Sequence, residues 1–352
     1  MSDQPMTPPS ATAEAGSARL RSKPGFWNQR LGLEALSYPI PDAATKIRYG
    51  LGFITLFSFV VLVLTGVWLA QFYNPTPAGA HPSVLYIITR APFGDIARSL
   101  HYWAASAMVV SLVAHIAWGF YSRAYRAPRE ITWYAGLAMA ALVFLLVVTG
   151  TILRYDQEGF EALAHLRAGA ALVGPLGSFF ASDFTLSVPL LSRMFVLHVA
   201  LLPLGILALL GIHLWLVRVL GISAEGPERS SFSENLRRLM GVSLLLFAGL
   251  VGLSVVFPEG LGHPAIAGFE ITKPFWPLLW IYALESATGM WALIWAPVAV
   301  FAFLAAVPLL DRGSAGGAGV LWLRVAGGVL LMALIALAVW AAITPPQQHL
   351  GM

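Results

Sequence analysis

The sequence has no cysteine and few charged residues. Of its 352 residues, 11% are Asp, Glu, Lys or Arg, whereas about 25% is usual for a soluble domain. So few charges cannot cover the surface of a soluble chain of this length, and 58% of the residues are hydrophobic. The composition therefore excludes an ordinary cytoplasmic enzyme and a disordered polymer, and it indicates an integral membrane protein.

The missing cysteines exclude several kinds of site within this chain. Disulfides, thiolate zinc sites, cysteine-ligated iron–sulfur clusters and haem attached by thioether bonds all need a sulfur that the sequence lacks. The net charge of +4 is not a sign of nucleic-acid binding, because basic residues in a membrane protein mainly mark its orientation.

Seven charge-free stretches are long enough to cross a bilayer, since a membrane helix takes about 20 apolar residues. These predicted spans are residues 49–73, 99–122, 131–153, 194–217, 240–258, 286–310 and 325–344. Residues 274–284 are also apolar but too short to span, and we expect them at the membrane interface. The fold class predicted is an all-α membrane protein, with a four-helix N-terminal bundle followed by a three-helix C-terminal half.

The polar stretch 221–234 is a candidate linker between these two halves. The predicted divisions are a flexible cytoplasmic tail at 1–26, a four-helix domain at 27–222 and a three-helix domain at 223–352. The tail is polar and has no apolar centre, so we do not expect it to be a signal peptide.

Basic residues are unevenly distributed over the predicted loops. The N-terminal segment and the loops after the second, fourth and sixth spans share one side, and they hold 15 of the 21 Lys and Arg residues. Positive charge favours the cytoplasmic side. We therefore expect a cytoplasmic N-terminus, with the C-terminus on the opposite, positive side of a bacterial-type inner or other energy-transducing membrane.

Four of the eight histidines lie inside predicted spans, where an ionisable side chain is costly and often functional. His101 and His115 are 14 residues apart in the second span, and His198 and His213 are 15 apart in the fourth. These spacings correspond to roughly 21 and 22 Å along a helix and return each pair to about one face. A lone buried histidine is often a packing residue, but packing does not explain two matched pairs.

The second and fourth spans run in the same direction, so their histidines pair at two heights. His101 lies level with His198 near the positive side, and His115 lies level with His213 near the negative side. Such pairs within a helix bundle predict two b-type haems, each held non-covalently by two histidines. A bare metal ion would need further oxygen or sulfur ligands, which these spans do not offer.

Other residues fit this prediction less specifically. Arg98 and Arg193 precede the positive-side histidines and are candidates for binding haem propionates, with interfacial anchoring as the alternative. Gly52 and Gly150 are candidates for close approach of a haem to the backbone, although packing of small residues between helices also explains them.

The order of these motifs resembles that of a known family. The motifs are Tyr38-Pro39-Ile40-Pro41, Thr65-Gly66, Arg98-Ser99-Leu100-His101, Tyr125-Arg126-Ala127-Pro128-Arg129-Glu130 and Gly221-Ile222-Ser223. With the histidine spacing, they resemble cytochrome b of the quinol–cytochrome c oxidoreductase (cytochrome bc) complexes. The resemblance covers about 27–344 and is strongest to the plastid-type branch, with its two parts fused in one chain. That branch attaches a further haem to a cysteine at the position of Gly50, so we expect no such haem here.

The resemblance implies the function and the partners. The chain would be the electron-transfer subunit of a quinol-oxidising respiratory or photosynthetic complex, moving electrons between two quinone sites through two bis-histidine b haems. Iron–sulfur (Rieske-type) and c-type cytochrome subunits would be its partners, and it would form a homodimer within the larger complex. Membrane quinone would be its substrate, and no nucleic acid is expected.

The positive-side quinone site departs from the family pattern. The family motif Pro-Glu-Trp-Tyr supplies a glutamate that takes a proton from quinol, but here the corresponding residues are Pro274, Phe275 and Trp276. Phenylalanine cannot accept a proton, so another carboxylate serves or the site does not oxidise quinol. By loop position the candidate proton acceptors are Asp156, Glu158, Glu270 and Glu285. Each is otherwise a solvated loop charge. Tyr155 is a further quinone-site candidate.

Lys46 and Arg218 are candidates for the negative-side quinone site, with positive-inside anchoring as the alternative. Two other functions stay open at this point. One is a transmembrane electron conduit with a degenerate positive-side quinol site, linking a periplasmic redox partner to one cytoplasmic-side quinone site. The other is a structural or transport protein without cofactors.

Overall fold

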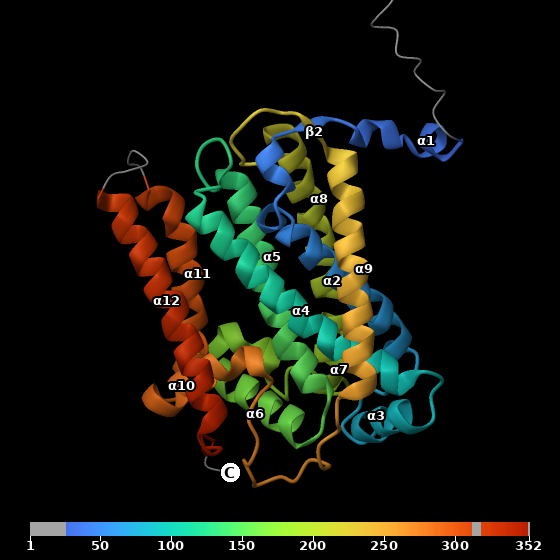
Figure 1. Ribbon diagram of the computed structural model, residues 1–352. Coiled ribbons are helices and arrows are strands. Elements are labelled where there is room, and N and C mark those ends of the chain that lie inside the picture. The colour runs from blue at the N-terminus through green and yellow to red at the C-terminus, as the bar shows by residue number, and fades with distance from the viewer. Residues whose placement is uncertain (1–25, 312–317, 351–352) are drawn as a thin grey trace, which may run out of the picture.

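The computed structural model describes residues 26–311 and 318–350. Most of them are helical, and seven helices are long and apolar enough to cross a membrane (Figure 1). The spans are α2 (Leu51–Ala70), α4 (Gly94–Tyr121), α5 (Glu130–Leu153), the continuous helix Leu190–Leu220, α9 (Phe232–Val256), α11 (Ala292–Leu310) and α12 (Ala318–Ile343). The predicted all-α membrane fold with seven spans is confirmed. All but the last residue of the tail predicted at 1–26 lies outside the described residues.

Five spans begin at least four residues from the start of their charge-free windows: α4 and the fourth span begin at Gly94 and Leu190 instead of 99 and 194, and α9, α11 and α12 also differ. Helix α9 includes Arg237 and Arg238, and α12 includes Arg324, so both helices begin before the apolar run does. Long basic side chains can extend toward the polar interface, which lets a helix continue past the hydrocarbon region. Helix α11 begins later than predicted because Gly289, with φ 85°, ends the preceding helix α10 (Leu279–Thr288).

Four spans pack together as two pairs. Helix α2 lies along α4, and α5 lies along α8 (Leu202–Leu220), the second part of the fourth span. One buried side chain from each of the four meets in a common core formed by Phe59, Met108, Val143 and Ile206. This packing gives α4 and the fourth span, which carry the four membrane histidines, a fixed relation to α2 and α5.

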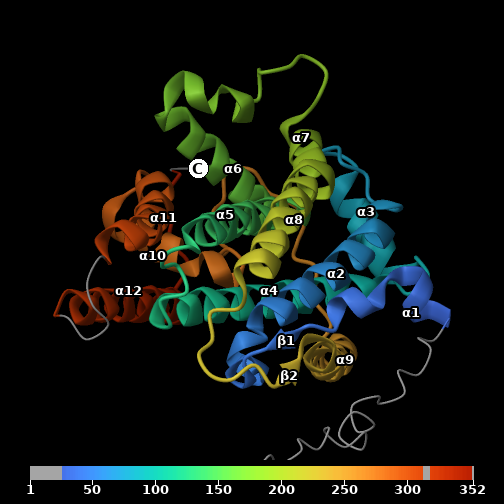
Figure 2. The same ribbon diagram turned by 90° about the horizontal axis from the view of Figure 1, so that it is seen from above.

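The three C-terminal spans lie in two places around these four. Helix α9 packs against α4 and α2, whereas α11 packs against α5. Helix α12 joins α11 on the flank away from α9, as both views show (Figures 1 and 2). The segment after residue 222 therefore covers two flanks of the four spans.

Short elements cover the two ends of the spans (Figure 1). The end that we call the α1 face carries α1 (Phe26–Leu31), the 3-10 turns at Leu33–Leu36, Asp42–Thr45 and Ile47–Tyr49, and a two-residue ladder between β1 (Pro39–Ile40) and β2 (Ser230–Ser231). This ladder ties the last part of the predicted linker to the segment before α2.

The opposite end, the α6 face, carries most of the structure outside the spans. Its elements are α3 (Ala80–Thr89), α6 (Gln157–Leu172), the 3-10 turns at Gly174–Phe180 and Trp276–Leu278, α10 and the C-terminal segment. The predicted interfacial segment 274–284 forms the second of these turns and the start of α10.

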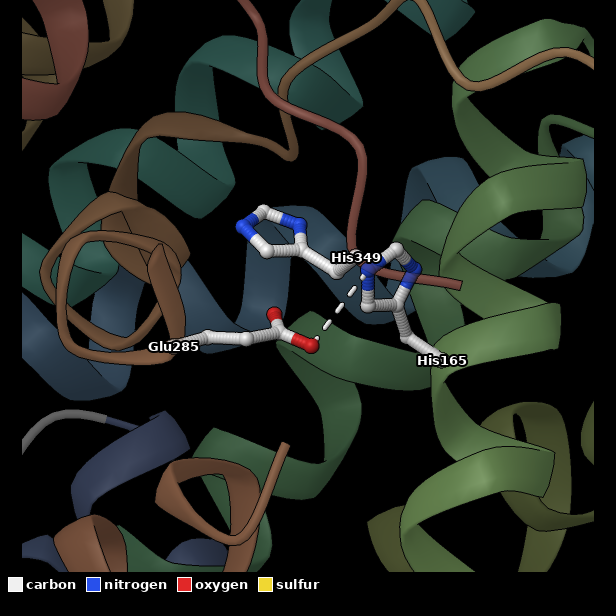
Figure 3. Close-up of side chains that lie close together, drawn as sticks. All are labelled: His165, Glu285 and His349. Carbon is white, nitrogen blue, oxygen red and sulfur yellow. Dashed lines mark ion pairs between the residues drawn. The ribbon is translucent and has the colours of Figure 1, made fainter. Parts of the chain in front are cut away.

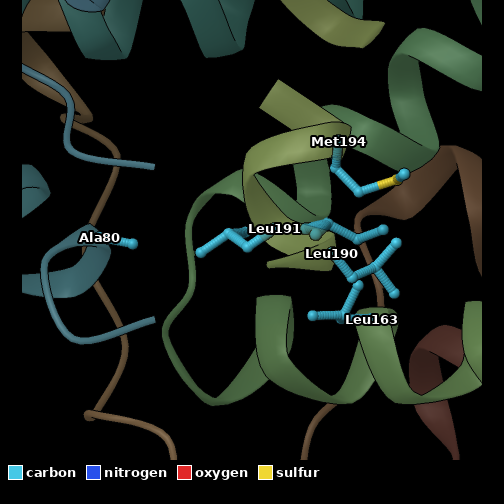
Figure 4. Packing of buried hydrophobic residues seen from close by; sticks show 6 residues of the cluster. Ala80, Leu163, Leu190, Leu191 and Met194 are labelled. Carbon is cyan, nitrogen blue, oxygen red and sulfur yellow. The ribbon is translucent and has the colours of Figure 1, made fainter. Parts of the chain in front are cut away.

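A buried cluster joins the α6 face to the spans (Figure 4). It contains Ala80 of α3, Ile152 of α5, Leu163 of α6, and Leu190, Leu191 and Met194 of α7 (Leu190–Val196). Burying each large apolar side chain contributes about 1.5–3 kcal/mol. The cluster therefore fixes the first turns of the fourth span, just before His198.

The fourth span has a wider turn at Leu197–Leu201, between α7 and α8. The N–H of Leu202 there bonds to the carbonyl of Leu197, five residues back. Pro203, which has no N–H and whose ring clashes with the carbonyl four residues back, follows directly. Such π turns often occur at functional positions, and this one contains His198.

Candidate functional site

The first pair of membrane histidines lies toward the α6 face. His101 of α4 faces His198 of the π turn, with ring centroids 6.3 Å apart and ring planes at 57°. Two imidazoles that share one metal ion, each at roughly 2 Å as in zinc sites, place their centroids about 6 Å apart. The spacing therefore fits two imidazoles that would hold one metal ion between them.

Threonines on α2 and α5 fix the orientation of these two rings. Thr65 Oγ1 lies 2.9 Å from His101 Nδ1, and Thr149 Oγ1 lies 3.0 Å from His198 Nδ1. Each hydroxyl donates its own proton to a helix carbonyl, at 2.7 Å for Thr65 and 2.8 Å for Thr149. It can therefore only accept from the ring, so Nδ1 carries the hydrogen and Nε2 keeps a lone pair for a metal.

The second pair lies toward the α1 face. His115 of α4 and His213 of α8 are close enough to interact electrostatically. His213 Nδ1 donates to the backbone carbonyl of Thr132 on α5 at 3.0 Å, which again leaves Nε2 as the ligand atom.

One glycine faces each of the four imidazoles. A Cβ atom added to Gly66, Gly52, Gly150 or Gly136 would lie 3.3, 3.0, 3.0 and 3.6 Å from Cε1 of His101, His115, His198 and His213 respectively. Two of these glycines are on α2 and two on α5. Because these four positions carry no side chain, the rings can approach the helix backbone closely, and a planar macrocycle needs the same space. The donor set and the cradle therefore fit haem held by histidine.

The two predicted propionate partners bind loop carbonyls. Arg98 donates to the carbonyl oxygens of Glu259 and, at 2.9 Å, Gly260. Arg193 donates to the carbonyl of Phe179 and, at 2.6 Å, to that of Ala181. These arginines hold two loops of the α6 face over the His101–His198 pair.

A cavity of about 420 Å³ lies on the α6 face next to this region. It is lined by Tyr102, Arg154, Glu158, Glu259, Gly260, Leu261, Gly262, Pro274, Phe275 and Trp276. The structure thus brings together four of the residues predicted for the positive-side quinone site: Glu158, Pro274, Phe275 and Trp276. Tyr102, Phe275 and Trp276 form an aromatic wall of the cavity, and contacts hold their rings in place. The ring centroids of Tyr102 and Phe275 are 5.1 Å apart, and Trp276 Nε1 donates to Ser106 Oγ at 3.0 Å.

Three carboxylates share Arg154 at the edge of this cavity: Asp156, whose Oδ2 lies 2.9 Å from Nη2, and the two cavity-lining residues Glu158 and Glu259. Arg154 Nη1 lies 2.9 Å from both Glu158 Oε2 and Glu259 Oε1. Burial raises the pKa of Glu158 to about 7; Arg154 acts to lower it, and the nearby carboxylates of Asp156 and Glu259 act to raise it. Burial also raises the pKa of Glu259. Glu158 can therefore take up and release a proton near neutral pH.

The other predicted residues lie elsewhere. Asp156 is fully buried and structural in its contacts: it caps α6 through the N–H of Gly159 at 3.1 Å and accepts from Gly262 at 2.8 Å. Glu270 belongs to a separate cluster with His165 and the C-terminal segment. Tyr155 has φ 48° and packs on Phe160 and the cluster of Figure 4.

The two candidates for the negative-side site are on the α1 face. Arg218 stacks over the ring of Tyr38 at 4.2 Å, and Lys46 is exposed before α2.

Thr149 and Glu259 are not among the residues that the sequence predicted. Thr149 repeats the Thr-Gly dipeptide of Thr65-Gly66, and this repeat is the sequence signal for it.

The fold and these residues define a multi-span helical membrane protein with two stacked pairs of histidines. The family described as "Cytochrome b/b6/petB" matches residues 35–221. The chain therefore belongs to the cytochrome b family, as the sequence predicted, and b-type haem is the cofactor of this family.

Individual relatives agree with this assignment. Cytochrome b6 of Heliobacterium modesticaldum is 34% identical over 198 residues, which cover 55% of this chain and 93% of that protein. The cytochrome bc complex cytochrome b subunit of Chlorobaculum thiosulfatiphilum is 32% identical over 256 residues, covering 67% of this chain and 60% of that protein. A chain of a hyperthermophilic respiratory Complex III has the same fold, with a TM-score of 0.75 at 24% identity, over 90% of this chain and 89% of that chain.

Proposed function

We propose that this chain is the diheme cytochrome b subunit of a quinol-oxidising bc-type complex. The observation that carries the proposal is the repeated arrangement around the four imidazoles, each of which faces its own glycine on α2 or α5. His101 and His198 would hold one haem, and His115 and His213 the other. The haem-binding half is then 27–222, and 223–352 is the C-terminal half.

The chain's contribution is to position these ligands. When bound, the haems accept and pass on single electrons. The protein holds the imidazoles at two heights, fixes the Nδ1 hydrogen on three of them, and has a glycine opposite each ring. Arg98 and Arg193, next to the α6-face pair, would supply positive charge to the haem propionates.

Quinol oxidation would take place in the cavity of the α6 face. Glu158 is the proposed proton acceptor in place of the glutamate that Phe275 replaces, because it lines the same cavity and its pKa is about 7. Arg154 holds this carboxylate in place at 2.9 Å, and the rings of Tyr102 and Trp276 form a wall for the quinol head. Asp156 and Glu270 do not line the cavity and are less suited to this role.

The remaining assignments rest on the family. We place quinone reduction on the α1 face near Lys46 and Arg218, and the α1 face in the cytoplasm because basic residues concentrate there. The relative from Chlorobaculum thiosulfatiphilum is named as a subunit of a cytochrome bc complex. This name implies an assembly with Rieske-type and c-type cytochrome subunits, which would dock on the α6 face. It also implies a homodimer.

Haem analysis of ligand variants tests the proposal. The purified chain should contain two b haems per polypeptide by pyridine haemochrome, and His198→Ala or His213→Ala should leave one. His81→Ala, which changes a histidine of α3 on the α6 face, should leave both. A preparation without a b-type spectrum, or unchanged haem content in both ligand variants, would contradict it. If positive-side inhibitors fail to block quinol-driven haem reduction, the chain is an electron conduit with a degenerate quinol site instead.

A further inference from the structure

A second cluster of ionisable side chains lies on the α6 face and shares no residue with the lining of the cavity. His165 of α6, Glu285 of α10 and His349 of the C-terminal segment have ligand atoms within 4.8 Å of one another. Figure 3 shows the three side chains converging from three separate elements. Glu270 adjoins them, with Oε1 3.1 Å from both His165 Nε2 and His349 Nδ1.

The hydrogen bonds around His165 leave a lone pair facing the carboxylates. Its Nδ1 donates to the backbone carbonyl of Glu161 at 2.8 Å, so in the neutral ring Nε2 is the unprotonated nitrogen. That Nε2 lies 3.5 Å from Glu285 Oε1. Both atoms are buried without a hydrogen-bond partner among the residues that the structure describes, and the side chain of Glu285 is 1% exposed.

His349 has the same arrangement. Ser286 Oγ donates to the carbonyl of Tyr282 at 2.9 Å, so it accepts from His349 Nε2, also at 2.9 Å. The unprotonated Nδ1 of His349 then faces Glu270 Oε1 at 3.1 Å. With both rings neutral, two imidazole lone pairs face two carboxylates, which is unfavourable unless a cation, either a proton on each ring or a metal ion, lies between them.

We propose that His165, Glu285 and His349, with Glu270 as the fourth ligand, bind a divalent zinc ion. Imidazole nitrogen with carboxylate oxygen in a set of four is a donor set that zinc accepts. In a tetrahedral zinc site with bonds of about 2.0–2.2 Å, the ligand atoms lie about 3.4 Å apart. The ligand atoms here lie within 4.8 Å of one another, so side-chain movements of about 1 Å would bring them to that spacing.

The ion would connect parts of the chain that are distant in sequence. Glu270 Oε2 already accepts from the backbone N–H groups of His349 and Leu350, at 2.7 and 3.0 Å. A zinc ion there would fasten the C-terminal segment to α6, α10 and the loop that leads to Pro274 and Phe275. The site is therefore structural, and it does not depend on the proposed quinol chemistry.

Zinc analysis of the full-length, haem-loaded protein tests the site. We expect one zinc ion per chain by mass spectrometry after gel filtration, with nitrogen and oxygen neighbours in zinc-edge X-ray absorption. Since loss of even an outer-shell partner weakens metal binding about 10–100-fold, His165→Ala and His349→Ala should each weaken it by at least about 100-fold. His263→Ala, an exposed loop histidine on the same face, is the matched control and should keep the zinc.

Three results would overturn the proposal. The first is a wild-type protein that lacks zinc and does not take up added zinc chloride in competition with a chelator of micromolar affinity. Protons on the imidazoles would then balance the charge of the carboxylates. The second is zinc lost equally from His263→Ala. The third is that zinc is retained both by the isosteric variant Glu285→Gln and by the variant His349→Ala. Haem content and gel filtration establish that each variant is folded, so loss of zinc from a folded Glu285→Gln protein supports the site even if His165→Ala does not fold.

Discussion

Four glycines decide how closely the histidine rings approach the backbone of α2 and α5. At Gly150 a Cβ atom would lie 3.0 Å from His198 Cε1, and at Gly52 it would lie 3.0 Å from His115 Cε1. Contacts that short force a neighbour to move. Because Nδ1 of His198 also contacts Thr149 Oγ1 at 3.0 Å, this ring cannot move without changing the direction of Nε2.

Substitution of Gly150 should therefore remove one haem. Gly150→Val adds a branched side chain against His198, and we expect haem content to fall from two to about one per chain, with the α1-face haem retained. Pyridine haemochrome and a redox titration measure this. Gly249→Val on α9 is the matched control, since a Cβ there meets nothing within 4 Å. Equal haem loss from both variants would show that the effect is not local to the ring.

Glu158 should give quinol oxidation a dependence on pH. A base must be deprotonated to accept a proton, and the pKa of Glu158 is about 7. The rate of quinol-driven haem reduction should therefore rise as pH increases through about 7 and level off above it. Glu158→Gln should lower the rate by about 10²–10⁴-fold and remove this rise.

The control for Glu158 is an acidic residue of the same face outside the cavity. Asp183→Asn, in the exposed loop after Phe180, should leave both the rate and its pH dependence unchanged. If Glu158→Gln keeps the wild-type profile and Glu259→Gln loses it, the proton acceptor is Glu259. If neither changes the profile, proton transfer at this cavity does not use the carboxylates that line it.

At the scale of the helices, the sequence predicted what depends on composition along the chain. Long apolar runs determine a membrane helix, so all seven spans were predictable, and so was the pairing of histidines at 14 and 15 residues. Helix ends were less predictable, because Arg237, Arg238 and Arg324 continue their helices into the polar interface. The charge-free window does not record this extension.

The parts of the site that were missed depend on contacts between distant elements. Glu259 joins the cavity only because Arg98 and Arg154 hold its loop over α4 and α6. The cluster of His165, Glu285 and His349 combines three elements, and no sequence spacing relates them. Phe275 was recognised as a departure, but that Glu158 lines the same cavity follows from the fold alone.

A buried ion pair should contribute to the stability of the α11 flank. Arg123, in the connection from α4 to α5, forms two hydrogen bonds to Asp311 at the end of α11, and Tyr125 adds a third at 2.7 Å. The side chains of Arg123 and Asp311 are 8% and 0% exposed. Removing one member of such a pair leaves a buried charge uncompensated and costs about 3–5 kcal/mol.

We therefore expect Asp311→Ala to lower the melting temperature of the detergent-solubilised protein by several degrees. Asp183→Ala, an exposed carboxylate of the α6 face, should leave it within the error of the measurement. The haem content of Asp311→Ala should stay at two when the protein is folded, because the pair lies outside the histidine helices. A melting temperature equal to that of the wild type would show that the pair does not stabilise this flank.

At the scale of the whole molecule, the two faces differ in charge and in structure. Within residues 26–311 and 318–350, the α1 face carries most of the basic residues, the short helix α1, 3-10 turns and a two-residue ladder. The α6 face carries α3, α6 and α10, the cavity and the histidine–glutamate cluster. An electron-transfer protein that takes quinol protons to one side of a membrane needs such a difference, and the charge distribution predicts which face is cytoplasmic.

The absence of cysteine makes this orientation directly measurable, because a single introduced thiol is the only one in the chain. Ser187→Cys lies in an exposed loop of the α6 face, and Glu225→Cys lies in the exposed connection from α8 to α9. Basic residues favour the cytoplasm, so we expect the α6 face to lie outside it. A membrane-impermeant maleimide added to spheroplasts should then label Ser187→Cys. Glu225→Cys should stay unlabelled until the membrane is permeabilised. The reverse pattern would place the α6 face in the cytoplasm, and the cavity at Glu158 would then release its protons to the negative side.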